Sequence, residues 1–323
     1  MSSNSTDGAS SAPFSIVGRK PVGRFAPSPT GPLHLGSLLA AVGSYLDARR
    51  HGGRWLVRME DLDTPRVVPG CADDILRTLA AYGFEWDGEV LYQSARREAY
   101  AAAILRLNEA GRTFACSCSR RELASAGGED APGYPGTCRA GVSRTGPASL
   151  RFRVNDAPIY FEDLFQGART FDLAACGDVV IRRRDGIVSY QLAVVVDDAH
   201  QQVTRVVRGA DLLASTAWQI DLQSALGAPH PIYGHLPLVV EADGAKLSKS
   251  RRAVPVERSQ VAQGLTATLT LLSQTPPADL GRAAIKDVWE WAFAHWDPQA
   301  LVGRSQVPCP PGATEKQNLL GKL

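Results

Sequence analysis

The sequence predicts an α/β fold with a doubly wound parallel sheet, and its first expected strand, loop and helix are the main support. Residues 22–26 form a short apolar segment that is interrupted by Pro27 and Pro29, as expected of a buried strand entering a loop. Beyond Gly36, apolar residues recur at helical spacing: Leu38, Leu39, Val42 and Leu46. This order of elements is typical of a nucleotide-binding unit, in which the start of the helix faces an anion.

A second apolar segment, residues 55–59, supports the same fold because acidic side chains follow it directly. Glu60, Asp61 and Asp63 come where this expected strand ends. Ligands of open α/β sheets bind at the carboxyl ends of the strands. We therefore expect these carboxylates to lie at or near a binding site.

The third observation is that the alternation of strands and helices stops and then resumes. From 113 to 184 the sequence has cysteines, Gly/Pro clusters and short strand-like segments such as 150–154, which predicts an insertion. The other expected elements are helices at 75–82 and 100–107, strands at 188–196 and 203–207, a helix at 214–226, an apolar segment at 236–240 and a helix at 285–296.

Length and composition are those of an ordinary globular protein with two or three structural units. The chain has 323 residues, 44% of them apolar and 21% charged, and it has no apolar run long enough to span a membrane. A net charge of +2 does not by itself indicate a nucleic-acid partner. Residues 1–18 are expected to be a disordered extension rather than a signal peptide, which favours a cytoplasmic protein without disulfide bonds.

Two loops contain residues suited to binding a nucleotide. His34 lies where a helix begins and can donate a hydrogen bond to a phosphate, while Gly36 permits close backbone approach. Much later, Lys246 and Lys249 offer cations for the charge that develops on a leaving pyrophosphate. Either loop alone could be an ordinary turn, and the Gly-x-x-x-x-Gly-Lys-Ser/Thr pattern is absent.

Three closely spaced cysteines suggest a metal site. Cys116, Cys118 and Cys138 would need a fourth ligand to hold zinc tetrahedrally. No histidine lies between positions 51 and 200, so the remaining candidates in this region are Glu122, Glu129, Asp130 and Tyr134. The alternative is that the three thiols are small buried apolar groups.

Taken together, the motifs resemble those of class I aminoacyl-tRNA synthetases of the glutamate/glutamine group. The residues from His34 to Ser37 match the His-x-Gly-x element of that class, and the residues from Lys246 to Ser250 match its lysine-containing element. The glutamate branch is matched by Arg24-Phe25-Ala26-Pro27-Ser28-Pro29-Thr30-Gly31, Arg58-Met59-Glu60-Asp61-Leu62-Asp63, Trp86-Asp87-Gly88, Asp185-Gly186 with Tyr190, Val195-Val196-Asp197-Asp198 and Arg208-Gly209-Ala210-Asp211. The resemblance covers about residues 19–250.

The resemblance implies a Rossmann-type catalytic domain divided by an insertion that contains a zinc site. Its first half would span 19–112, the insertion 113–184 and its second half 185–235. The segment 236–323 would hold the lysine loop, a short and mostly helical C-terminal part and a loose tail, with no anticodon-binding domain. The remaining range, 1–18, is the disordered extension.

The resemblance also assigns roles to individual residues. Those implied for glutamate binding are Arg24, Phe25, Ala26, Pro27, Ser28, Glu60, Tyr190 and Arg208. Glu60 would bind the ammonium group, while the arginines and Tyr190 would surround the carboxylates, which favours glutamate over glutamine. Those implied for ATP are His34, Gly36, Ser37, Lys246 and Lys249, with His34 and Lys249 catalytic. Ser37 replaces a second histidine found in many relatives, and Trp218 replaces an arginine.

For the cysteine cluster, the resemblance implies one structural zinc ion per chain. Short relatives of glutamyl-tRNA synthetases hold zinc with a Cys-x-Cys pair followed by Tyr-x-x-x-Cys, which here gives Cys116, Cys118, Tyr134 and Cys138. The resemblance also implies ATP with Mg²⁺ as a substrate. Cys71, Cys176 and Cys309 are expected to be ordinary thiols.

The segment after Ser250 decides which member of the group the chain resembles. Only 73 residues follow it, fewer than the helical anticodon-reading region needs. The chain therefore resembles the shortened paralogues that activate glutamate without tRNA and transfer it to queuosine in the anticodon of tRNA(Asp). The expected partners are L-glutamate, ATP and queuosine-containing tRNA(Asp), for a monomer with no membrane contact. The alternatives are a compact enzyme that charges a tRNA 3′ end and a catalytically inactive RNA-binding paralogue.

Overall fold

A computed structural model describes residues 20–119, 121–123, 133–142, 146–240 and 255–309. The expected extension 1–18, residues 241–254 with the two lysines of the predicted ATP site, and residues 310–323 lie outside the described residues. Within the described part, no helix is both long and apolar enough to cross a membrane.

The first half of the parallel sheet consists of β1 (Val22–Phe25), β2 (Arg54–Met59) and β3 (Leu91–Tyr92), in that order. The crossover from β1 to β2 is α1 (Leu35–Arg50), which packs on both strands. Its apolar residues, Leu38, Leu39, Val42 and Leu46, are fully buried. The predicted strand, loop and helix are therefore confirmed, as is the strand at 55–59.

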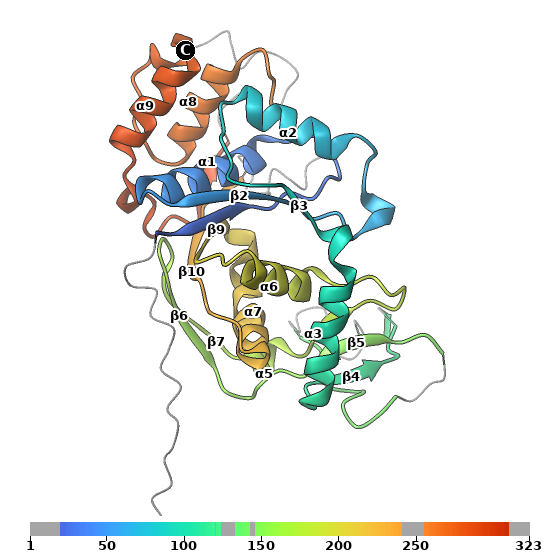
Figure 1. Cartoon of the computed structure of the whole chain (residues 1–323). Helices are drawn as coiled ribbons and strands as arrows, with labels where there is room; N and C mark the ends of the chain where they lie inside the picture. Colours follow the sequence, from blue (N-terminus) through green and yellow to red (C-terminus); the bar gives the residue numbers. More distant parts are fainter. Residues whose placement is uncertain (1–19, 120, 124–132, 143–145, 241–254, 310–323) are drawn as a thin grey trace, which may run out of the picture.

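The second half of the sheet has the order β7 (Gly167–Phe171), β6 (Ile159–Asp163), β10 (Ile232–Leu236) and β9 (Arg205–Gly209). Strand β9 lies beside β1, and the N–H of Thr204 donates to the carbonyl of Val22 where both strands start. Strands β1, β2, β9 and β10 therefore end at the same edge of the layer (Figure 1). This confirms the predicted α/β fold with a parallel sheet.

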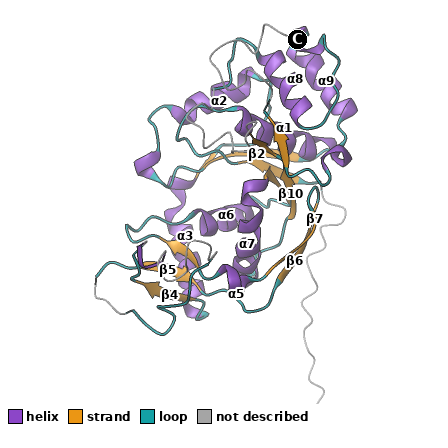
Figure 2. Ribbon diagram, turned by 180° about the vertical axis from the view of Figure 1, so that it is seen from behind, coloured by secondary structure: helices purple, strands orange, loops and turns teal. Residues whose placement is uncertain are grey.

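The range 113–184 contributes strands to two different sheets. Strands β4 (Thr113–Cys116), β5 (Ser149–Phe152) and β8 (Val179–Arg182) form a separate antiparallel sheet. The hairpin β6–β7 instead joins the parallel sheet, because Asp163 pairs with Tyr233 of β10. Figure 2 shows β4 and β5 at the end of the molecule opposite to the C-terminal helices.

The remaining helices surround these sheets. They are α2 (Cys71–Ala81), α3 (Arg97–Glu109), α5 (Leu173–Cys176), α6 (Tyr190–His200), α7 (Leu213–Leu226), α8 (Val261–Leu271) and α9 (Ile285–His295). Short 3₁₀ segments are η1 (Thr64–Arg66), η2 (Gln93–Arg96), η3 (Ala210–Leu212), η5 (Leu280–Arg282) and η6 (Pro298–Leu301). The short strands β11 (Leu238–Val240) and β12 (Gln306–Pro308) pair in parallel as a separate two-stranded sheet, which ties the end of the described chain to the segment that follows β10.

One predicted element is wrong: residues 188–196 were expected as a strand, but 190–200 form helix α6. Its residues from Leu192 to Val195 are all buried, so the apolar run has no exposed face to reveal a helical period. Short apolar runs cannot be assigned to strand or helix by periodicity alone. The expected helices at 75–82, 100–107, 214–226 and 285–296 and the strand at 203–207 are confirmed within a few residues.

An aromatic cluster in the hydrophobic core around α1, β1 and β2 joins the C-terminal helix α9 to the sheet. Tyr45 of α1 makes edge contacts with Trp55, Phe84 and Trp289 of α9, at centroid distances of 4.9 to 5.3 Å. The indole N–H of Trp289 donates to the carbonyl of Tyr82 over 2.9 Å. Such pairs stabilise a core beyond the area they bury, so α9 is held as part of this half.

Candidate active site

A pocket of about 710 Å³ opens at the edge where the parallel strands end. It is lined by the segment that follows β1, the start of α1, Glu60 after β2, Tyr190 at the start of α6, and Arg208 near the end of β9. Residues 237–239, after β10, complete the wall. The pocket thus contains the described residues that the sequence predicted for two different substrates: Arg24, Phe25, Ala26, Pro27, Ser28, His34, Gly36, Ser37, Glu60, Tyr190 and Arg208.

Two arginines at the base of the pocket share one carboxylate. Arg24 donates from Nε to Asp198 over 3.2 Å and from Nη2 over 3.4 Å, and Arg58 donates from Nη1 over 2.7 Å. All three side chains are at least nine-tenths buried. Arg58 also contacts Glu60 over 3.4 Å and Gln201 over 2.8 Å. Asp198 of α6 therefore fixes residues of β1 and β2.

Burial and neighbouring charge act in opposite directions on these carboxyl groups. Burial raises the pKa of Asp198, but the guanidinium groups of Arg24 and Arg58 outweigh it, so this pKa lies below its usual value. For Glu60, burial is the larger effect, and its pKa is raised despite the attraction of Arg58 and Arg24. Asp198 is thus held as an anion, whereas for Glu60 burial outweighs the longer ion pair with Arg58, 3.4 Å.

Arg208 is held at the side of the pocket by hydrogen bonds. Its Nη1 donates to the hydroxyl of Tyr190 over 3.0 Å, and its Nη2 donates to Thr216 over 2.8 Å. Its Nε donates to His235, which is fully buried, over 3.1 Å. Arg208 and Tyr190 therefore present a positively charged, hydrogen-bonding wall.

The start of α1 forms the opposite part of the pocket. His34 is the N-cap of α1, and its Nδ1 accepts from the backbone N–H of Ser37 over 3.3 Å. With Nδ1 as acceptor, the neutral ring carries its proton on Nε2, which lies 3.2 Å from the Ser37 hydroxyl. A Cβ at Gly36 would lie 3.2 Å from the His34 ring, so glycine leaves room for that imidazole.

Lys246 and Lys249 lie outside the described residues, but both ends of their loop lie at this pocket. Leu238 and Val239, just before the loop, are lining residues. On its far side, Pro255 pairs with His34, and the N–H of Val256 donates to the carbonyl of Leu33 over 2.9 Å. The described residues on both sides of 241–254 therefore lie at the pocket, and those that follow it lie beside His34.

Several residues of the site were not assigned by the sequence analysis. Arg58 and Asp198 belong to the matched motifs, so their place in those motifs was the available signal. No signal in the sequence indicated His235, Thr216 or Asp163, because their contacts depend on the packing of β6, β9, β10 and α7. Trp218 does not line the pocket: its indole donates to the carbonyl of Gly177 over 3.0 Å.

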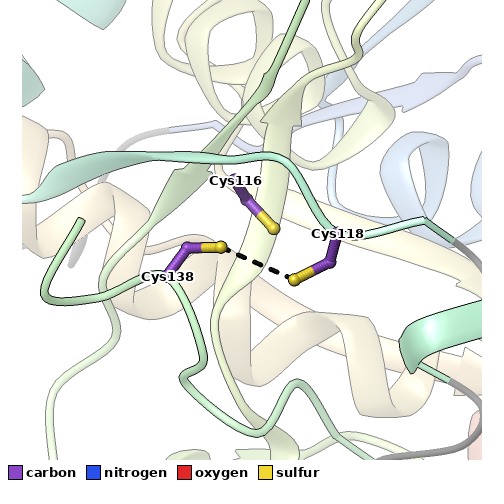
Figure 3. A group of neighbouring side chains, drawn as sticks. All are labelled: Cys116, Cys118 and Cys138. Atoms are coloured by element: carbon purple, nitrogen blue, oxygen red, sulfur yellow. Dashed lines mark hydrogen bonds between the residues drawn. The ribbon is translucent and has the colours of Figure 1, made fainter. Parts of the chain in front are cut away.

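The cysteine cluster lies away from the pocket, at the end of β4. Figure 3 shows Cys116, Cys118 and Cys138 pointing toward one another, with their sulfur atoms within 4.8 Å. The sulfurs of Cys118 and Cys138 are 3.5 Å apart, and that of Cys116 lies 3.5 Å from the Tyr134 hydroxyl. Tetrahedral zinc with bonds of about 2.3 Å places sulfur ligands about 3.8 Å apart. The three sulfur atoms are therefore close enough together to hold a metal ion.

Other candidate ligands are less well placed or lie outside the described residues. The carboxylate of Glu122 accepts from the N–H of Ser119 over 2.8 Å, and Glu129 and Asp130 are not described. Burial raises the pKa of the Cys138 thiol, but hydrogen bonds from Tyr134, from the backbone at Ser117 and from the neighbouring thiols lower it to about 7. One thiolate is thus accessible near neutral pH, as metal binding needs.

The fold and the pocket are those of a class I tRNA synthetase. The family model for "tRNA synthetases class I (E and Q), catalytic domain" matches residues 21–274. A crystal structure of a glutamate tRNA ligase from Elizabethkingia meningosepticum, in complex with its amino acid, superposes with a TM-score of 0.72 at 25% identity. That match covers 90% of this chain and 67% of the ligase chain.

Relatives with higher sequence identity show to which branch of this class the chain belongs. The Glutamyl-Q tRNA(Asp) synthetase of Aromatoleum aromaticum is 56% identical over 293 residues, which cover 90% of this chain and 93% of the relative. That of Dechloromonas aromatica is 54% identical over 294 residues, covering 89% and 98%. At this identity and coverage, the chain belongs to the family of glutamyl-Q tRNA(Asp) synthetases.

We predict that Asp198→Asn lowers the free energy of unfolding by about 3 kcal/mol at pH 7, because two buried guanidinium groups lose their anion. Urea denaturation measures this loss. Since the pKa of Asp198 is lowered by folding, its stabilising effect is present above its unfolded pKa of about 3.9 and is lost at lower pH. The matched control is Asp74→Asn, a more exposed partner of Arg258, which should cost less than about 1 kcal/mol. Equal losses would contradict the prediction.

Proposed function

We propose that this chain activates L-glutamate with ATP, without tRNA, and transfers the glutamyl group to queuosine in the anticodon of tRNA(Asp). The observation that carries the proposal is that one pocket holds His34 and Gly36 together with Glu60, Tyr190 and Arg208. A nucleotide and an amino acid can therefore meet there. The names of the relatives and their matching lengths support the acceptor.

The polar groups of the pocket suit the two charged ends of glutamate. In this proposal, Glu60 binds the ammonium group, whose charge offsets the burial of its carboxylate. Arg208 and Tyr190 bind the side-chain carboxylate through donors that already face the pocket. Arg24, held by Asp198, adds a positive charge beside them, and 25–28 shape the wall.

The activation step needs positioning and charge rather than a nucleophile on the protein. An oxygen of the α-carboxylate of glutamate attacks the α-phosphorus of ATP and forms a new P–O bond. The bond between the α-phosphorus and the oxygen that bridges to the β-phosphate breaks. In this proposal, His34 donates a hydrogen bond from Nε2–H to the departing pyrophosphate and Lys249 neutralises its charge, while Lys246, Gly36 and Ser37 help to hold the nucleotide. Mg²⁺, bound with ATP, would add positive charge on the phosphates.

The transfer step forms an ester. A hydroxyl of the cyclopentenediol ring of queuosine attacks the carbonyl of glutamyl-adenylate, AMP leaves and the hydroxyl proton is released. The anticodon loop must then reach the pocket with a base turned outward, which is how proteins commonly bind single-stranded RNA loops. No covalent intermediate with the enzyme is required.

We also propose one structural zinc ion, held by Cys116, Cys118, Tyr134 and Cys138. The support is the sulfur spacing and the place of the Tyr134 hydroxyl, 3.5 Å from Cys116. The backbone of Tyr134 forms a β-bridge with Gly177, where a Cβ would lie 2.3 Å from the Tyr134 nitrogen, so this close approach needs a glycine. With four protein ligands the site would be closed and would stabilise the region rather than take part in the reaction.

The first prediction from the proposed function concerns pH. Because the pKa of Glu60 is raised in the empty pocket, the KM for glutamate should rise on acidification at a higher pH than for an ordinary carboxylate, while the KM for ATP stays constant. Pyrophosphate exchange measures both constants, and Glu60→Gln should raise the glutamate KM at every pH and remove this dependence. An unchanged glutamate KM in that variant would exclude the ammonium-binding role.

The second prediction concerns zinc. The purified protein should contain about one zinc per chain, and Cys138→Ser should reduce that content several-fold and lower the melting temperature, since a thiolate ligand is lost. Elemental analysis by mass spectrometry is the measurement. Cys176→Ser, at a partly buried thiol outside the cluster, should keep its zinc. Full zinc content in Cys138→Ser would rule out this ligand set.

The third prediction tests the function itself. Labelled glutamate should be attached to tRNA(Asp) that contains queuosine, and removal of the 3′-terminal adenosine should not prevent it. Glutamate-dependent pyrophosphate exchange without tRNA is the control that separates activation from transfer. If trimming the 3′ end abolishes labelling while queuosine-free tRNA is still charged, the chain is instead a compact glutamyl-tRNA synthetase.

A further inference from the structure

Behind Arg208 lies a buried pair of side chains, His235 and Asp163, to which the proposed reaction gives no role. His235 is the fourth residue of β10 and is fully buried; Asp163 ends β6 and is 4% exposed. The Nδ1 of His235 lies 2.5 Å from an Asp163 oxygen, and its Nε2 lies 3.1 Å from the Nε of Arg208. The three groups thus form one chain that ends at the pocket.

The protons in this chain have only one consistent arrangement. The Nε of arginine always carries hydrogen and can only donate. The Nε2 of His235 must therefore accept, so the imidazole is neutral and carries its proton on Nδ1. That proton is donated to Asp163. Burial lowers the pKa of His235, and the nearby Arg208 adds to this, against the opposing hydrogen bond to Asp163.

The carboxylate of Asp163 has a fixed orientation. Its Oδ1 accepts backbone N–H bonds from Phe165, Gln166 and His235, each 3.0 Å long. Its Oδ2 is thereby left facing the His235 ring. Burial raises the pKa of Asp163, but the bonds from His235 and these backbone groups outweigh it and keep the carboxyl ionised. A fixed acceptor thus sets the tautomer of the imidazole.

The remaining contacts of Arg208 determine what it offers to a ligand. Its Nε–H is used by His235, and its Nη2 lies 2.8 Å from Thr216 and 3.5 Å from the carbonyl of Leu212. One Nη1–H is donated to the hydroxyl of Tyr190, which must then donate its own proton elsewhere. The second Nη1–H and the Tyr190 O–H are two donors with no acceptor beside them among these groups. Such a pair suits a carboxylate and not a carboxamide, whose NH₂ needs an acceptor.

We propose that Asp163 and His235 are positioning residues that lock the orientation of Arg208 and thereby set the preference of the pocket for glutamate over glutamine. The inference rests on the proposed function in one respect, namely that Arg208 and Tyr190 bind the side-chain carboxylate. The orientation itself does not depend on any substrate. If His235 carried its proton on Nε2, two donors would face each other and Arg208 would turn away.

The variant that tests this is Asp163→Asn, which keeps the shape and reverses one hydrogen bond. Its Oδ1 can still accept the three backbone N–H groups, but its NH₂ now donates to Nδ1 and drives the His235 proton to Nε2. We expect the glutamate KM to rise roughly 10-fold or more and the preference for glutamate over glutamine to fall by a similar factor, with kcat and the ATP KM within about 2-fold.

A second variant, His235→Gln, separates positioning from folding. A glutamine oxygen in place of Nε2 can accept from Arg208 without help from Asp163, so this variant should keep most of the preference for glutamate. Adding Asp163→Asn to it should then cause no further loss of selectivity. That non-additivity would not follow from a merely structural role, for which the two losses would sum.

Nitrogen-15 NMR of the six histidines tests the tautomer without any substrate, with the His235 signal assigned by its absence in His235→Gln. A neutral ring protonated on Nδ1 is expected in the unaltered chain, and one protonated on Nε2 in Asp163→Asn. A charged or Nε2-protonated His235 in the unaltered chain would overturn the inference, as would unchanged selectivity in Asp163→Asn. Failure of the unaltered chain to activate glutamate would instead refute the proposed function and leave the NMR result valid.

Discussion

The shared hydrogen bonding of Arg24 and Arg58 to Asp198 is the interaction on which the site depends. It joins α6 to the paired strands β1 and β2 at the edge where the pocket opens. The neighbouring Asp197 binds Arg96 and Tyr100 over 2.6 and 2.7 Å, so α6 is tied to α3 as well. Two adjacent carboxylates on α6 thus fix the base of the pocket. Because Asp198 is buried and binds two arginines, those side chains have little conformational freedom.

The same principle recurs around the pocket: each group that faces the cavity is held by a partner behind it. Asp198 holds Arg24, His235 holds Arg208, and the backbone of Ser37 orients His34. Groups held in this way need little reorganisation when charge develops during a reaction, which is the basis of electrostatic preorganisation. Glu60 is the exception, because burial raises its pKa in spite of its ion pair with Arg58.

The cysteine cluster is distant from the pocket but is not independent of it. Arg184 donates to the carbonyls of Ser117 and Cys118, and Trp218 of α7 donates to Gly177, which packs on Tyr134. Arg183, next to Arg184, binds Asp63 over 3.1 Å, just beyond β2. Arg183 and Arg184, which precede α6, therefore contact both the cluster and the segment after β2.

The sequence by itself determined the parallel α/β fold and the residues that line the pocket, because short motifs at strand ends carry their chemistry locally. Its prediction of a strand at 188–196 was wrong, since the run from Leu192 to Val195 is buried throughout and shows no helical period. The tertiary structure alone revealed the roles of Asp163 and His235, whose partners lie 72 and 27 residues away in sequence. The direction of each hydrogen bond in a buried series of polar groups depends on which atoms the packing brings together. No local pattern of residues encodes it.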